Sequence, residues 1–175
     1  MSNTVTQHAL DLSRTMIKVF EGCRLIPYLD IAKIPTIGYG NTRYKDGSSV
    51  KMVDKVITQQ QADDFLEYHL VKECVPAVNM IIPPLQDIPT ASLLSLIYNI
   101  GAYAFLRSSL FTMINSCAFS KSDIADKFIA YNKYREDNVL KVSDGLTKRR
   151  TIEAMVFNGE ILCNEQVIKQ MYAKR

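Results

Sequence analysis

The chain has 175 residues, of which 47% are apolar and 22% are charged, and its formal net charge is +3 at pH 7. This composition is that of a globular protein rather than a disordered one, and the length suits one well-buried core that two unequal lobes can share. The positive charge is too small to indicate a nucleic-acid-binding protein, although it would suit an anionic polymer surface such as a bacterial wall.

The cysteine and histidine pattern does not indicate a metal centre. Four cysteines have no CxxC spacing and only two histidines accompany them, so we expect no metal site and no cofactor. The N-terminus lacks the regions of a signal peptide, and no stretch approaches the roughly 20 apolar residues of a membrane span. We therefore expect a cytosolic chain with reduced thiols, although the count would allow two disulfides among Cys23, Cys74, Cys117 and Cys163.

Residues 7–21 are predicted to form an amphipathic helix, because apolar residues recur at i+4 spacing from Leu12 to Phe20. Gly22 stands where a left-handed C-terminal cap is expected. Glu21 would then lie at the negative end of the helix dipole, which favours the protonated carboxyl that a general acid needs. The alternative interpretation is a solvent-exposed glutamate at a helix end.

The glycine-rich segment that follows is predicted to be a strand. Ile37 and Tyr39 would pack on one face, whereas Gly38 and Gly40 leave the other face without side chains. A bulky ligand could approach the backbone there, with the Thr36 hydroxyl at the edge. Taken alone, a twisted or bulged edge strand explains these glycines better.

The later part of the chain is predicted to be mainly helical. An antiparallel sheet of about three strands should end with residues 49–53, after which a capping box from Thr58 to Gln61 opens a long helix that reaches Cys74 or beyond. Residues 90–100 are apolar nearly all round, which indicates a buried central helix. Further helices are expected near residues 103–116, 122–134, 147–157 and 164–173.

This order of elements predicts an α+β fold in a single domain, residues 1–175. A β lobe is expected at about residues 24–57, and a helical lobe at about residues 58–175 together with the N-terminal helix. His69 falls on an apolar stripe, so we expect it to be packed rather than catalytic.

Glu21, Asp30 and Thr36 form the most informative pattern in the chain. Cleavage of a sugar acetal needs an acid to protonate the leaving oxygen, and a second carboxylate to handle the water or the developing cation. Two carboxylates alone are common. The hydroxyl at the head of a glycine-rich strand, at this fixed spacing, makes the set specific.

Residues 21–42, EGCRLIPYLDIAKIPTIGYGNT, resemble the signature of the phage-type lysozymes, the muramidase endolysins of tailed bacteriophages. Residues 95–101 and 105–110 resemble the central buried helix of that family and its next turn. Residues 145–153 resemble its late segment with an arginine pair. Together these motifs cover roughly residues 8–160.

The resemblance implies a lysozyme-like fold, with a small β lobe and a larger all-helical lobe joined by a long helix. It also implies hydrolysis of the β-1,4 bond between N-acetylmuramic acid and N-acetylglucosamine in peptidoglycan. Glu21 would be the general acid, and Asp30 and Thr36 would hold the attacking water on the opposite face, which is the inverting arrangement. The expected substrate-binding residues are Gly38, Tyr39, Gly40, Asn99 and Arg149.

Arg149, or failing that Arg150, is expected to form an ion pair with Glu21. The sequence departs from the family pattern in three places: Tyr131 or Tyr134 replaces a tryptophan, Asp137-Asn138 replaces a glycine pair, and Cys23 lies beside Glu21.

The resemblance further implies peptidoglycan glycan strands as the partner, with a monomer, no nucleic acid and no membrane span. The chain would be made in the host cytoplasm and would act on the cell wall in the periplasm after release by a holin.

Three alternatives are open. A lytic transglycosylase would cleave the same bond with one glutamate, without needing Asp30 and Thr36 as a water-holding pair. A non-catalytic wall-binding or phage structural module on the same fold would predict a damaged triad, whereas all three residues are present. A helical regulator that carries the motif by chance ranks last.

Overall fold

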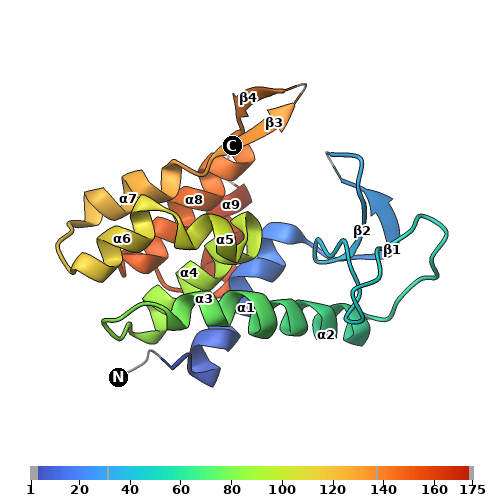
Figure 1. The fold of residues 1–175 in the computed structure, drawn as a ribbon, viewed down its shortest axis with the longest axis horizontal. Helices are drawn as coiled ribbons and strands as arrows, with labels where there is room; N and C mark the ends of the chain where they lie inside the picture. The colour runs from blue at the N-terminus through green and yellow to red at the C-terminus, as the bar shows by residue number, and fades with distance from the viewer. Residues whose placement is uncertain (1–3, 31, 137, 174–175) are drawn as a thin grey trace.

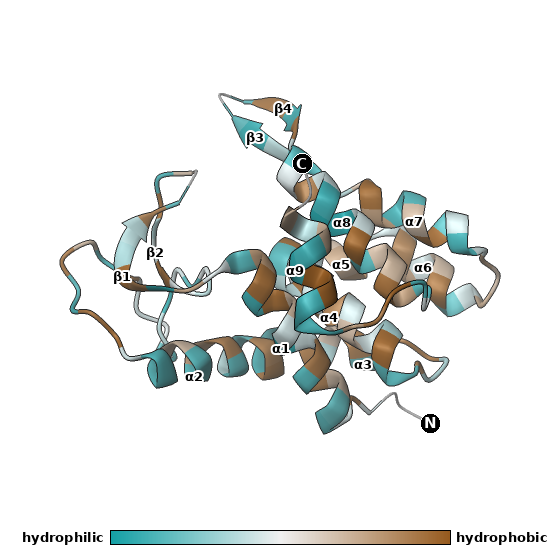
Figure 2. Cartoon of the chain, turned by 180° about the vertical axis from the view of Figure 1, so that it is seen from behind, coloured by the Kyte–Doolittle hydropathy of each residue, from teal (hydrophilic) through white to brown (hydrophobic). Residues whose placement is uncertain are grey.

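Figure 1 shows a small lobe around two strands and a larger helical lobe, with a long helical stretch running beneath both. The computed structural model describes residues 4–30, 32–136 and 138–173. In Figure 2 several helices alternate between hydrophilic and hydrophobic residues along their length, as expected where one face of a helix is buried. The α+β, lysozyme-like fold predicted from the sequence is confirmed.

Helix α1 (Gln7–Glu21) has the predicted bounds. At its start, the Thr6 hydroxyl accepts a hydrogen bond from the Ala9 amide at 3.1 Å. It ends at Gly22, whose φ of +64° lies in the region that side chains disfavour. The helix therefore stops directly after Glu21, and the carboxylate is placed where the two lobes meet.

The small sheet has two strands instead of the expected three. β1 (Arg24–Leu29) pairs antiparallel with β2 (Pro35–Gly38), and the expected strand at residues 49–53 is reduced to a single bridge between Arg43 and Ser49. The reason lies in local hydrogen bonds. The amide of Lys51 donates to the Asp54 carboxylate at 2.7 Å, which commits this backbone to a turn.

The joining helix begins at the predicted capping box, in which Thr58 and Gln61 each bond to the other's backbone. It continues as α2 (Gln59–His69), a π-helical segment η1 (Leu70–Cys74) and α3 (Val75–Asn79). Pro76 lies within this helical stretch and does not end it. Since proline lacks an N–H and its ring crowds the preceding turn, we attribute the wider π-helical turn just before it to this residue.

Helix α4 (Asp87–Ile100) is the predicted central helix. Every residue from Thr90 to Ile97 is buried, and the helix packs against α1 and against α8 (Asp144–Phe157). Gly101, with φ +85°, ends it. This packing brings the end of α1 and the last turn of α4 to the same side of the molecule.

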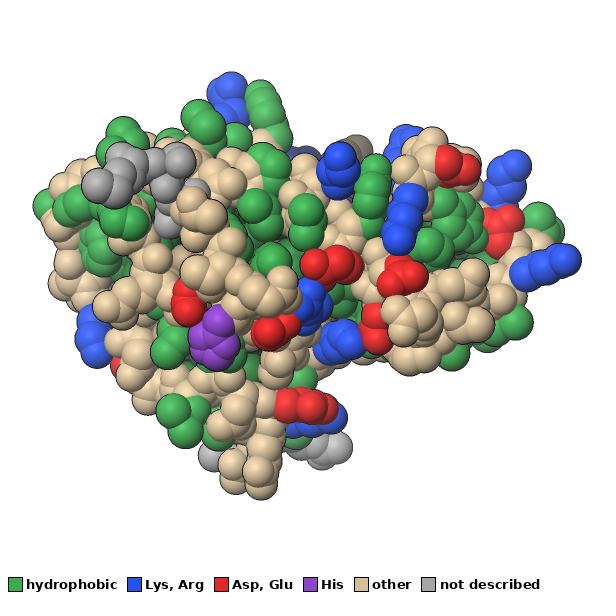
Figure 3. Space-filling view, turned by 90° about the horizontal axis from the view of Figure 1, so that it is seen from below, with side chains coloured by type: hydrophobic (Ala, Val, Ile, Leu, Met, Phe, Trp, Pro, Cys, Tyr) green, Lys and Arg blue, Asp and Glu red, His purple; other side chains and the backbone are tan. Residues whose placement is uncertain are grey.

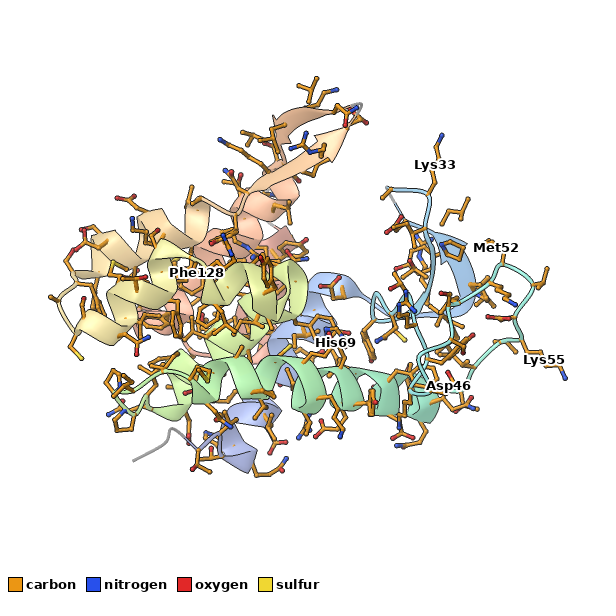
Figure 4. All side chains as sticks on the ribbon, in the orientation of Figure 1. Lys33, Asp46, Met52, Lys55, His69 and Phe128 are labelled. Carbon is orange, nitrogen blue, oxygen red and sulfur yellow. The ribbon has the colours of Figure 1, made fainter. Side chains whose placement is uncertain are left out.

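The remaining helices are α5 (Ala102–Leu106), α6 (Ser109–Ser116), α7 (Lys121–Ile129) and α9 (Glu165–Ala173). The helix expected at residues 103–116 is divided in two, because Ser108 caps a new helix by accepting from the Phe111 amide. In Figure 4, Phe128 of α7 lies inside the helical lobe.

A second antiparallel hairpin, β3 (Lys133–Glu136) and β4 (Val139–Val142), begins within the last two residues of the helix predicted near residues 122–134 and continues beyond it. This hairpin was not predicted, because it is short and mostly exposed and no buried face marks its period. Of the expected departure at Asp137-Asn138, only Asn138 is described, and it lies directly before β4. Asp137 lies outside the described residues, and Asn138 has φ +63°.

All four cysteines are free thiols. Within the described ranges, the helices are too short or too polar to cross a membrane.

Candidate active site

A cleft with a volume of about 380 Å³ lies between the lobes and contains all three predicted catalytic residues. Its lining residues are Glu21, Tyr28, Asp30, Thr36, Tyr39, Gly40, Tyr98 and Asn99. Glu21 comes from the end of α1, the next five from the β1–β2 hairpin and the turn that follows it, and the last two from the final turn of α4. The signature and the central helix, far apart in the sequence, therefore form one site.

The Glu21 carboxylate is held by an ion pair. Arg149 Nη1 donates to Glu21 Oε1 at 2.6 Å, and the Glu21 side chain is 20% exposed whereas that of Arg149 is 4% exposed. The predicted bridge to Arg149 is therefore present. The Arg149 guanidinium also lies 5.0 Å from the centre of the Phe20 ring. These contacts fix Glu21 Oε1 and leave Oε2 toward the cleft.

Gly40 lies beside the other oxygen of this carboxylate. A Cβ atom at this position would be in ordinary van der Waals contact with Glu21 Oε2, at 3.5 Å, so space alone does not exclude a side chain. The backbone conformation does favour glycine, because its φ of +87° is one that side chains disfavour.

Asp30 and Thr36 are oriented by one residue in the hairpin between them. The Ile34 amide donates to Asp30 Oδ1 at 2.8 Å, and the Thr36 hydroxyl donates to the Ile34 carbonyl at 2.9 Å. The single hydroxyl proton of Thr36 is thereby used, so its oxygen can only accept from a further partner. Asp30 Oδ2 is likewise an acceptor. The pair thus presents two acceptors to the cleft.

The two arginines of α8, Arg149 and Arg150, belong to a buried network of polar contacts. Arg149 Nε donates to Glu153 Oε1 at 3.0 Å, and Arg150 Nε lies 3.1 Å from Glu153 Oε2. Ser95 donates to Glu153 Oε1 at 2.7 Å. Burial lowers the pKa of Arg150 to about 10, although the nearby Glu153 opposes this effect.

Two tyrosines shape the cleft. The Tyr98 hydroxyl donates to the Tyr39 carbonyl at 2.9 Å, and Gln59 Nε2 donates to the Tyr39 hydroxyl at 2.9 Å. Burial raises the pKa of both phenols, so they act as neutral groups. His69, on α2, packs edge-on to Tyr98 with the ring centroids 4.7 Å apart. Its packing agrees with the expectation.

Two of the expected substrate-binding residues lie elsewhere. A Cβ at Gly38 would lie 3.6 Å from the Ala62 Cβ, so this glycine faces α2 rather than the cleft. The φ of +65° at Gly38 breaks the alternation of the strand and turns Tyr39 toward the cleft instead. Arg149 is buried behind Glu21 and does not line the cleft. Its contacts are those of a residue that positions Glu21.

Sequence reasoning missed Tyr28 and left Tyr98 as a core residue. Tyr28 lies within the signature and pairs with Thr36 across the hairpin, and this register could have identified it. Tyr131 lines a separate cavity of about 520 Å³ that shares Asn99 with the cleft, whereas Tyr134 lies on β3. Cys23 is exposed. In the part of the chain that the structure describes, no three metal-ligating side chains cluster.

A glutamate at a helix end shares a cleft between two lobes with an aspartate and a threonine, and this residue set is compatible with a glycosidase. The profile of the family described as "Phage lysozyme" matches residues 18–153. The chain belongs to the phage lysozyme family.

Relatives agree over most of the chain. An endolysin of Acyrthosiphon pisum secondary endosymbiont phage 1 is 30% identical, over 87% of this chain and 99% of the relative. The endolysin of Salmonella phage P22 is 33% identical, over 82% and 92%. A solved structure, the endolysin from Escherichia coli O157:H7 phage FAHEc1, has a TM-score of 0.79 and 34% identity, covering 92% of this chain and 98% of that one.

Proposed function

We propose that the protein is an endolysin that hydrolyses the β-1,4 bond between N-acetylmuramic acid and N-acetylglucosamine in peptidoglycan, with inversion at the anomeric carbon. Membership of the phage lysozyme family supports a lysozyme-type glycosidase acting on the bacterial wall. The observation that carries the finer proposal is the joint presence of Glu21, Asp30 and Thr36 on one cleft.

Glu21 acts as the general acid. Arg149 holds Oε1, so the proton is delivered from Oε2, next to the backbone of Gly40 where no side chain blocks the leaving oxygen. As the glycosidic C–O bond breaks, this proton moves to the leaving oxygen and Glu21 becomes ionised beside the Arg149 cation.

Asp30 and Thr36 hold the attacking water. Because both present acceptors, a water can donate one hydrogen to Asp30 Oδ2 and the other to Thr36 Oγ1, leaving a lone pair for the anomeric carbon. When the new C–O bond forms, the water proton passes to Asp30, which acts as the base. Exchange with solvent then returns Asp30 and Glu21 to their starting states. No covalent sugar adduct is needed.

The lytic transglycosylase alternative uses no water and therefore gives the water-holding pair no role. A wall-binding module without activity would not need Glu21, Asp30 and Thr36 together on one cleft. The face seen in Figure 3 mixes acidic and basic side chains, which gives no support to a nucleic-acid-binding surface.

The proposal extends to where the protein acts. We infer that the chain is made in the host cytoplasm, works as a monomer and reaches peptidoglycan after a holin opens the inner membrane. Fractionation of expressing cells, with and without a co-expressed holin, tests this route. Lysis that does not depend on the holin would contradict it.

The test of the activity compares the wild type with Glu21→Gln on purified peptidoglycan. Glutamine preserves size but cannot deliver a proton, so turbidity loss should slow by at least about 10²-fold. The matched control is Glu160→Gln, which changes an exposed glutamate outside the cleft and should leave the rate unchanged. Products with new reducing ends support hydrolysis. Anhydro sugars, or full activity in a folded Glu21→Gln variant, would overturn the proposal.

A further inference from the structure

The arginine pair of α8 serves two different residues of the cleft. Arg149 reaches Glu21, whereas Arg150 Nη2 donates to Asn99 Oδ1 at 3.1 Å. Both arginines lie against the same buried carboxylate, Glu153. Glu153 therefore contacts both the arginine that holds Glu21 and the arginine that contacts the Asn99 side-chain amide.

The contact with Arg150 decides which end of the Asn99 amide faces the substrate. A guanidinium has only donors, so it can bind the amide oxygen but not the amide nitrogen. Arg150 is fully buried and forms an ion pair with Glu153, in which Arg150 Nε lies 3.1 Å from Glu153 Oε2. If the Asn99 amide were rotated by 180°, its NH₂ group would face the N–H groups of the buried Arg150 guanidinium, and no hydrogen bond could form between them. The Asn99 oxygen is therefore held inward, and its NH₂ group is left to face the cleft.

We propose that Arg150 is a positioning residue that fixes Asn99 as a hydrogen-bond donor, and that Asn99 thereby selects a sugar with an acetamido group at this subsite. This inference rests on the proposed function and names a substrate group that the cleft recognises. The acetamido carbonyl is an acceptor that suits the exposed NH₂ group. A sugar ammonium, which results when the acetyl group is removed, has only donors and is rejected.

The surroundings of Asn99 fit the same group. Asn99 lines both the cleft and the neighbouring cavity, where Ile100 and Leu146 provide aliphatic surface. An acetamido group that gives its carbonyl to Asn99 can place its methyl against this surface. A hydroxyl, which can both donate and accept, would be bound by either orientation of the amide and would need no fixed donor.

The experiment measures kcat/KM on N-acetylated peptidoglycan and on the same material after chemical N-deacetylation. In Asn99→Asp, one carboxylate oxygen still accepts from Arg150, and the other presents an acceptor to the cleft. The ratio of kcat/KM on acetylated to deacetylated glycan should fall by at least about tenfold, which corresponds to one lost hydrogen bond. The loss on acetylated glycan should appear mainly in KM. Asn164→Asp makes the same charge change at an exposed position outside the cleft and should leave the ratio unchanged.

Arg150 is tested through the same ratio. Arg150→Met removes the donor that holds the amide and should lower the ratio, whereas Arg150→Lys keeps a donor and should restore part of it. If Arg150→Met does not fold, Asn99→Asp still decides, because Asn99 is exposed and its replacement keeps the buried contact. An unchanged ratio in Asn99→Asp would overturn the inference while wild-type cleavage continued. Absence of cleavage by the wild type would instead contradict the proposed function.

Discussion

Removal of the Arg149 side chain tests how the acid is held. Arg149 donates to Glu21 at 2.6 Å, to Glu153 at 3.0 Å and to the Ser95 carbonyl at 3.1 Å, and it is only 3% exposed. Breaking a buried ion pair by removing one partner costs about 3–5 kcal/mol. Because Glu153 keeps Arg150 and Glu21 is partly exposed, we expect Arg149→Ala to cost about 3 kcal/mol, at the lower end of that range.

The assay combines thermal unfolding with the rate of wall lysis. For a chain of this length, a loss of about 3 kcal/mol should lower Tm by about 6–12 °C. The rate of lysis should also fall, because Glu21 Oε1 is no longer held by Arg149.

A double-mutant cycle isolates the contact itself. If Arg149 acts through Glu21, Arg149→Ala should cost less in a Glu21→Gln background, with a coupling of at least about 1 kcal/mol. A Tm within about 2 °C of the wild type, which corresponds to a loss under about 1 kcal/mol, together with an unchanged rate of wall lysis, would refute the reasoning.

Three further changes test other parts of the site. Thr36→Ser should retain measurable lysis, because serine keeps a hydroxyl that can accept from the water. Thr36→Val should lose most of the activity, and equal rates of lysis in the two variants would contradict the water-holding role of Thr36. Gly40→Ala should cost about 1–2 kcal/mol in urea unfolding, because alanine is strained at φ +87°, and it should reduce lysis because this strained backbone lies beside Glu21. A neutral effect on both would contradict the strain argument. Burial lowers the pKa of His69 below its ordinary value of 6.5, although nearby Glu73 opposes this effect. The unfolded chain therefore takes up the proton first, and stability is lost as the pH falls below about 6.5. His69→Gln should make Tm less dependent on pH in this range, and an unchanged dependence would argue against a role for His69.

The sequence predicted those features that local chemistry determines. The helix period and Gly22 located the end of α1, and the pattern of Glu21, Asp30 and Thr36 singled out three residues that the structure places on one cleft. The capping box at Thr58 predicted the start of α2, and the continuous apolar run of α4 predicted the buried central helix. The ion pair between Arg149 and Glu21 followed from family resemblance rather than from any local pattern.

The features that were missed depend on contacts between distant segments or on unusual dihedral angles. Gly38 was assigned to the cleft face by strand alternation, which its positive φ interrupts. The β3–β4 hairpin carries no buried face that a periodicity could reveal. The orientation of Asn99 depends on Arg150, 51 residues later, and no pattern within one helix contains that information.

The most direct test of the account is the anomeric configuration of the first product. Proton NMR of soluble peptidoglycan fragments, recorded in the first minutes of digestion by the wild type, distinguishes the new reducing end before it equilibrates. A water held by Asp30 and Thr36 attacks from the face opposite to Glu21, so the β-linked substrate should yield the α-anomer first. Initial release of the β-anomer would show retention and would contradict the water mechanism.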